Sequence, residues 1–331
     1  EPSGYIQEQI GGISSLATYT KYLEMAENDF PTMLAKLENI RNVILDGEKF
    51  RDGCIINLTG DADVLSDVEE KVNNMVEKLP GSGGGAGGKQ VDFYVEEHPW
   101  IAAARGKMGA PKNEGELSAC LFFQNKTIST NLTQRFLCAG FVVPTQVSYV
   151  GKGGQLYNKG EEVKGSASVV SRFLRSGYLW DHVRVIGGAY GGFCTFSPGS
   201  GIFSFLSYRD PNLETTLDTY DGAAEFLLKQ AEEITEEQLT TAIIGMVGDL
   251  DGVMSPDQVG WVSLKRWMSG ESAEVRQLWR DQVIGTKKED FVEFAERLKD
   301  LESTDAVVSS AGAIEKAKEA GKKFENVETV F

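Results

Sequence analysis

The chain has 331 residues, of which 41% are hydrophobic and 25% are charged. This is the composition of an ordinary globular protein, and it excludes a disordered or a membrane-embedded chain. The net charge of -16 disfavours nucleic acid and anionic membranes as partners and favours basic ligands. The length leaves room for about two domains with an ample core.

The first 80 residues predict an all-helical segment interrupted by one strand. Apolar residues at helical spacing indicate that the second helix is amphipathic, and Ser66 with Glu69 has the pattern of a capping box. The expected elements are helices at 13–27 and 31–45, a buried strand at 53–59, and a helix from Ser66 to about residue 79. This order of elements is typical of the C-terminal part of an α/β sandwich domain.

Residues 81–140 begin with a glycine-rich run that superficially resembles a phosphate-binding loop. Such a loop needs a lysine followed by serine or threonine at the start of a helix, whereas Gln90 follows Lys89 here. The run therefore predicts a flexible linker, and 91–140 an insertion with a loop near 105–115. A nucleotide-binding enzyme would need nucleotide binding that depends on Lys89, and none is expected.

Residues 141–331 predict a second unit of mixed helices and strands. Capping boxes at Thr235 with Gln238 and at Thr286 with Glu289, and Ser255 before Pro256, mark three helix starts. The expected elements are strands at 142–150 and 305–309, and helices at 163–176, 211–230, 235–248, 255–270, 286–301 and 313–320, with Asp210 as a cap for the second helix.

Residues 183–208 predict two strands joined by a turn at 197–200. In the second strand, Phe203 and Phe205 alternate with Ile202, Ser204 and Leu206, so both faces are apolar and we expect a sheet that is covered on both sides. Glycine pairs at 187–188 and 191–192 flank Tyr190. They leave the backbone open to a ligand, and a bulge or tight bend is the alternative.

The four cysteines, Cys54, Cys120, Cys138 and Cys194, lie in or beside apolar runs without metal-binding spacing, and so predict buried free thiols. A calcium loop at 249–252 is rejected, because its glycine comes too early and no glutamate closes it.

Three motifs resemble the presequence proteases, a family in the pitrilysin and insulysin group of zinc metallopeptidases. They are WDHVR at 180–184, GGAYGGF at 187–193 and SYRDPNL at 207–213, with further similarity at 144–152, 216–222 and 242–245. The resemblance implies an α+β fold of peptidase-like domains, each a mainly antiparallel sheet packed against helices. It assigns 1–80 to the end of a third such domain and 141–331 to a complete fourth, so the chain is expected to begin in mid-protein.

A zinc peptidase of this group needs His-x-x-Glu-His, but the two histidines of this chain, His98 and His182, have no partner at that spacing. No metal ligand is therefore expected here, and the resemblance places zinc in another part of the full-length enzyme. It also implies that Arg184, with Gly187 and Gly188, holds the substrate and that the Tyr190 hydroxyl stabilises an oxyanion. The residues alone would make Arg184 a surface ion-pair residue and Tyr190 a sheet residue.

The resemblance implies the C-terminal, substrate-binding portion of a zinc metalloendopeptidase that degrades cleaved targeting presequences and short unstructured peptides. The expected partners are the peptide and the N-terminal catalytic half, and the expected location is the mitochondrial matrix or the chloroplast stroma. A non-catalytic scaffold or regulatory subunit with a peptidase-like fold is the alternative.

Overall fold

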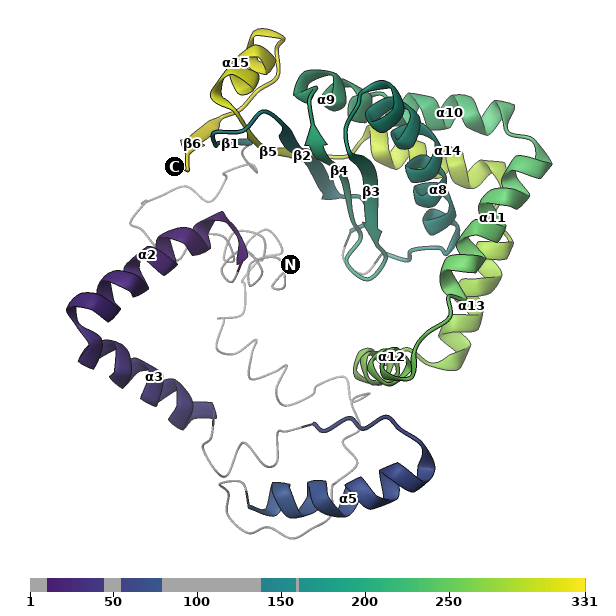
Figure 1. Cartoon of the computed structure of the whole chain (residues 1–331). Helices are drawn as coiled ribbons and strands as arrows, with labels where there is room; N and C mark the ends of the chain where they lie inside the picture. Colours follow the sequence, from purple (N-terminus) through teal and green to yellow (C-terminus); the bar gives the residue numbers. More distant parts are fainter. Residues whose placement is uncertain (1–10, 45–54, 79–137, 159–160, 331) are drawn as a thin grey trace. The chain divides into compact units, whose positions relative to one another are not determined.

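The computed structural model describes residues 11–44, 55–78, 138–158 and 161–330 (Figure 1). The chain divides into two compact units, one formed by 1–127 with 253–272 and the other by 128–252 with 273–331. The boundaries predicted at residues 80 and 140 stay predictions, and the expected linker, Lys89, His98, Cys54 and Cys120 lie outside the described residues. Among the helices described, none combines the length and apolarity needed to cross a bilayer.

In the first unit, the helices follow the prediction better than the strand does. Its described elements are α2 (Ile13–Asn28), α3 (Phe30–Ile44), α5 (Ala62–Glu77) and α12 (Pro256–Ser269). The described part of the predicted strand, 55–59, is exposed and forms no strand, because no other strand in the described part of this unit takes its backbone hydrogen bonds. Ser66 is not a cap, since α5 already begins after Asp61. For α12 the prediction is confirmed, with Ser255 as N-cap and Gly270 in the left-handed conformation at its end.

The second unit is built on one six-stranded sheet with the strand order β3-β4-β2-β5-β1-β6 (Figure 1). The strands are β1 (Ala139–Val142), β2 (Ser148–Gln155), β3 (Gly191–Ser197), β4 (Ile202–Asp210), β5 (Ser303–Ser309) and β6 (Asn326–Thr329). The pairs β2–β4, β2–β5 and β3–β4 are antiparallel, whereas β1 pairs with β5 and β6 in parallel. The predicted α+β fold with a mainly antiparallel sheet is confirmed.

The strand predicted at 142–150 is two strands, β1 and β2. Pro144 lies between them and has no N–H group with which to continue a ladder. Thr145 forms the connection, since its hydroxyl donates to the Val147 carbonyl at 3.1 Å. The short strand β6 was not predicted.

The helices of the second unit are α8 (Ser166–Leu174), the π-helix η1 (Arg175–Ile186), α9 (Leu213–Asp221), α10 (Ala223–Glu233), α11 (Glu236–Leu250), α13 (Ala273–Ile284), α14 (Lys288–Lys299) and α15 (Ala311–Glu319). The capping box of Thr235 and Gln238 is confirmed. The helix predicted at 211–230 is divided into α9 and α10 at Gly222. The box of Thr286 and Glu289 is wrong by one residue, because the Lys287 backbone N–H donates to Asp290 while Thr286 is buried and bonds to Val283.

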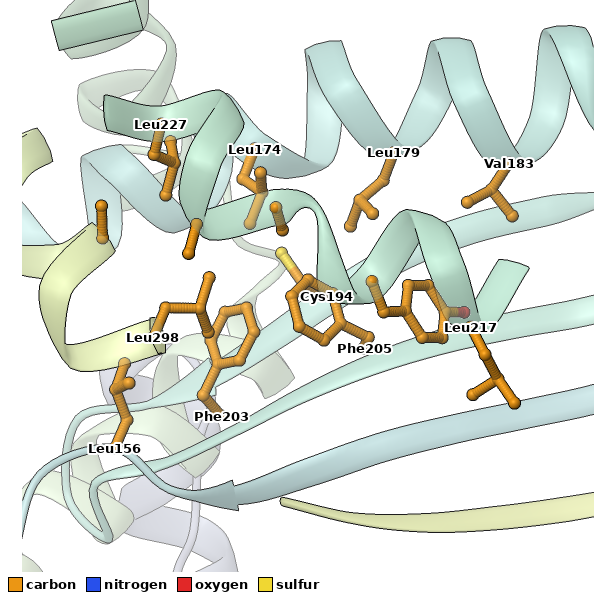
Figure 2. Close-up of a cluster of buried hydrophobic side chains, with 14 of the residues drawn as sticks. Leu156, Leu174, Leu179, Val183, Cys194, Phe203, Phe205, Leu217, Leu227 and Leu298 are labelled. Carbon is orange, nitrogen blue, oxygen red and sulfur yellow. The ribbon is translucent and has the colours of Figure 1, made fainter. Parts of the chain in front are cut away.

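The core of this unit lies between one face of the sheet and the helices α8, η1, α9, α10 and α14 (Figure 2). Phe203 and Phe205 point into it, as predicted, and the Phe205 ring stacks on Tyr220 with centroids 4.8 Å apart. On the other face of β4, Ile202 and Leu206 are only half-buried. Among the described residues this second face is only partly covered, so the expected cover on both faces stays a prediction.

The packing of η1 on β3 depends on Gly192. A Cβ atom at this position would lie 2.6 Å from both Val183 Cβ and Cγ1, and Val183 is itself buried. We expect Gly192→Ala to force the two elements apart and to destabilise the unit by about 1–3 kcal/mol. The matched control is Gly199→Ala in the β3–β4 turn, where a Cβ would meet nothing within 4 Å. Equal melting temperatures for the two variants would contradict this account.

Candidate active-site surface

Arg184 lies near the end of the π-helix η1, which continues directly from α8. The strand predicted from residue 183 is therefore wrong at its start, because 183–186 are helical. Leu179 and Val183 are buried against the core, and this leaves Trp180 and Arg184 exposed. The Arg184 guanidinium lies 4.1 Å above the Trp180 ring, and it has no carboxylate partner among the described residues. π-helical segments are rare and occur frequently at functional sites.

The turn at 187–190 is fixed to η1 by its own backbone. The N–H of Gly188 donates to the Arg184 carbonyl at 3.0 Å, and that of Ala189 donates to the Val183 carbonyl at 3.1 Å. A Cβ on Gly187 would lie 2.6 Å from the Val183 carbonyl oxygen, and Gly188 has φ +76°. Both glycines are thus explained by the tight bend that was the alternative. Their role in substrate binding stays a prediction.

Asn212 and Asp210 hold this turn from the other side. The Asn212 side-chain amide donates to the Gly187 carbonyl. Asp210 is fully buried, and its carboxylate accepts from the Asn212 backbone N–H at 2.8 Å and from the Thr216 hydroxyl at 2.6 Å. Asp210 is therefore not the N-cap of α9, a position that Asn212 occupies. Through these two hydrogen bonds, Asp210 fixes the segment that carries the Asn212 side-chain amide.

Strand β4 contains an irregularity beside Tyr190. The register against β2 shifts between Ser148 and Val150, so that Tyr149 lies opposite both Tyr208 and Arg209. Arg209 has φ +51°, a conformation that costs a non-glycine residue about 1–2 kcal/mol. The Tyr190 N–H donates to the Arg209 carbonyl at 3.3 Å. Bulges of this kind re-aim side chains next to functional sites.

Three exposed tyrosines lie in contact beside this bulge, and we call Tyr149, Tyr208 and Tyr190 the tyrosine row. The rings of Tyr190 and Tyr208 meet edge to face with centroids 5.5 Å apart, and those of Tyr208 and Tyr149 do so at 5.6 Å. Tyr190 is 64% exposed. Within the described part of the chain its hydroxyl has no hydrogen-bond partner, so it is available to a ligand.

Arg184 and Tyr190 are thus carried by the two ends of one turn, and their side chains contact different aromatic residues. Trp180, Tyr208 and Asn212 belong to the motifs that carry the resemblance, but the sequence alone assigned them no role. The spacing of Trp180 and Arg184, four residues apart on a helix, was the signal that could have paired them. The contacts of Tyr208 and Asn212 depend on pairing between distant segments, and no spacing in the sequence indicates them.

The other polar clusters in the described part of the chain do not form a metal site. No group of three histidine, cysteine or acidic residues within the described ranges could hold a metal ion. His182 packs its ring against Tyr178 with centroids 4.6 Å apart. In the rejected calcium loop, Asp249 pairs with Arg172 at 2.8 Å and Asp251 pairs with Arg280.

A cavity of about 260 Å³ lies between α8, β3 and α11. Two arginines that line the cavity, Arg172 and Arg175, both pair with Asp249, which lines it as well. Burial raises the pKa of its cysteine, Cys194, to about 12, so this residue is a thiol at neutral pH and a poor nucleophile. Cys194 is a buried free cysteine as predicted, and Cys138 is free but only half-buried.

Comparison with known proteins identifies the family. The family model described as the PreP C-terminal domain matches residues 139–312. Presequence protease 1, chloroplastic/mitochondrial, of Arabidopsis thaliana is 37% identical over 311 residues, which are 94% of this chain and 24% of that protein. The mitochondrial presequence protease of Mus musculus is 24% identical over 86% of this chain and 25% of its own length.

The chain therefore spans about a quarter of the length of these relatives. Among solved structures, that of pitrilysin has a TM-score of 0.43 and 10% identity, covering 58% of this chain and 21% of pitrilysin. Because the family model covers more than half of the sequence, the chain belongs to the presequence protease family.

Proposed function

We propose that this chain is the C-terminal, substrate-binding portion of a zinc metalloendopeptidase that degrades cleaved targeting presequences and other short unstructured peptides. The observation that carries the proposal is the exposed Tyr190 hydroxyl, which has no partner among the described residues although its ring and backbone are held by Tyr208 and Arg209. The names of the relatives, presequence proteases of mitochondria and chloroplasts, support the substrate class and a location in the mitochondrial matrix or the chloroplast stroma.

The residues of this chain do not fit a zinc site of the inverted type. The sequence contains two histidines, and the described residues contain no group of three metal ligands. In our proposal, zinc and the glutamate that activates water belong to an N-terminal catalytic half, which is the partner of this chain. A scaffold that keeps the fold without catalysis is the alternative.

The contribution of this chain would be made by two polar groups. The Tyr190 hydroxyl would donate a hydrogen bond to the oxygen that becomes negative in the tetrahedral intermediate, where a fixed neutral donor is most effective in a closed, water-poor site. The Arg184 guanidinium would bind a carbonyl or carboxylate of the peptide, with its orientation limited by the Trp180 ring beneath it. The net charge of -16 would favour the approach of basic peptides.

The proposal is tested by Arg184→Ala in the complete protein that contains this chain. We expect KM for a presequence peptide to rise by about tenfold while kcat changes less, because the arginine contacts both the ground state and the transition state. Arg276→Ala, which removes an exposed arginine from α13, controls for the change in net charge. A complete protein that binds the peptide and never cleaves it would favour the scaffold. Equal KM values for the Arg184→Ala and Arg276→Ala variants would show that Arg184 does not bind the substrate.

A further inference from the structure

We propose that the tyrosine row of Tyr149, Tyr208 and Tyr190 binds one large uncharged side chain, aromatic or aliphatic, of an extended peptide. This inference rests on the proposed function and adds to it a determinant of side-chain specificity. The row lies on the face of the sheet opposite the core, where neighbouring strands β2 and β4 and the residue before β3 bring the three rings together.

The row has the features of a built binding surface. Its rings are in contact and are between 38% and 64% exposed, so apolar area is offered to solvent by side chains that are already ordered. Tyrosine binds with little loss of conformational freedom, because only two side-chain torsions must be fixed. The register shift and the positive φ of Arg209 hold Tyr208 between its neighbours, and backbone strain of this kind is concentrated at functional sites.

The charges around the row select against a cationic side chain. The Arg209 guanidinium lies 6.0 Å from the centre of the Tyr208 ring, and Arg184 covers Trp180 near the other end of the turn. A lysine or arginine of the peptide would meet these cations at the aromatic faces that it would otherwise occupy. A carboxylate could pair with Arg209, but an exposed ion pair contributes little, and the electron-rich faces of the rings disfavour a negative charge. An uncharged side chain gains apolar burial without either cost.

The position of the row indicates which part of the peptide it contacts. Tyr190 forms one end of the row, and its hydroxyl is the group that we propose to face the reacting carbonyl. The side chain bound by Tyr208 and Tyr149 would therefore belong to a residue close to the bond that is cut. The row would influence which bond of an unstructured peptide is placed there.

The test uses peptide binding to the complete protein in the presence of a chelator, so that cleavage does not interfere. Four polar peptides differ only in a central phenylalanine, leucine, lysine or glutamate. We expect the wild type to prefer the phenylalanine and leucine peptides over the charged ones by about tenfold. Tyr149→Ala should reduce this preference several-fold, whereas Tyr149→Phe, which keeps the ring, should retain it.

The matched control is Tyr22→Ala in α2, which removes a tyrosine of comparable exposure, 48% against 42% for Tyr149, from the other unit. An unchanged preference in Tyr149→Ala, or an equal loss of affinity for all four peptides, would overturn the inference. A different result would contradict the proposed function without contradicting this inference. If Tyr190→Phe kept full kcat while Tyr149→Ala still lost the preference, the row would stand as a peptide-binding surface and the catalytic role of Tyr190 would not.

Discussion

Replacing Tyr190 by phenylalanine in the complete protein is expected to lower kcat for a presequence peptide by about 30- to 1,000-fold, with little change in KM. The substitution removes one hydroxyl and keeps the ring that contacts Tyr208. Loss of one donor to a developing oxyanion costs about 2–4 kcal/mol in the transition state alone, and such a loss affects kcat rather than ground-state binding. Steady-state kinetics with one peptide measure both constants.

The melting temperature should hardly change, because the side chain is 64% exposed and its hydroxyl has no partner in the described part of the chain. Tyr22→Phe in α2 removes an exposed tyrosine hydroxyl from the other unit and should leave kcat unchanged. A Tyr190→Phe enzyme with full kcat and a much lower melting temperature would show that Tyr190 is a structural residue of the sheet.

Phe205→Ala is expected to destabilise the second unit by about 3–5 kcal/mol, the usual cost of removing a buried aromatic ring. Phe205 is 2% exposed, stacks on Tyr220 and meets the Phe203 ring edge to face with centroids 4.8 Å apart. The cavity would open between β4 and α9, both of which contribute side chains to the core shown in Figure 2. Chemical denaturation followed by circular dichroism measures the loss.

Tyr190→Ala is the matched control for stability, since it deletes an aromatic ring from the exposed surface of the same unit. Its effect should stay below about 1.5 kcal/mol, because this exposed ring contributes only its edge-to-face contact with Tyr208. Similar losses for the two variants would mean that the core between the sheet and α9 contributes less to stability than its burial indicates.

The sequence predicted helix ends correctly where all the residues of a capping motif were present. Thr235 with Gln238, and Ser255 with Pro256 and Gly270, begin or end helices as expected, because the capping atoms lie within one turn of each other. Prediction failed where tertiary contacts decide. Thr286 has the right neighbours for a cap, but it is buried and its hydroxyl bonds to Val283.

The candidate site was less accessible to prediction than the fold. Arg184 and Tyr190 were named only through the family resemblance, since no periodicity distinguishes them from other exposed residues. A sequence pattern does not reveal that η1 is a π-helix or that Arg209 has a positive φ. The helix η1 packs on β3 where Val183 meets Gly192, and Arg209 lies where the register of β4 against β2 shifts, so both features involve contacts between segments that are distant in the sequence.

The strand order has a consequence for the synthesis of the protein. Strand β5 joins β2 to β1, so Val150 pairs with Ser207 on one side and with Val307 on the other. A ribosome completes β1 and β2 long before β5, and until then β2 has an unpaired edge and β1 has no partner. Pairing across such sequence distances is slow, and unpaired edges favour aggregation. We therefore expect the nascent chain to need protection, such as binding by a chaperone, until residues 303–309 have emerged.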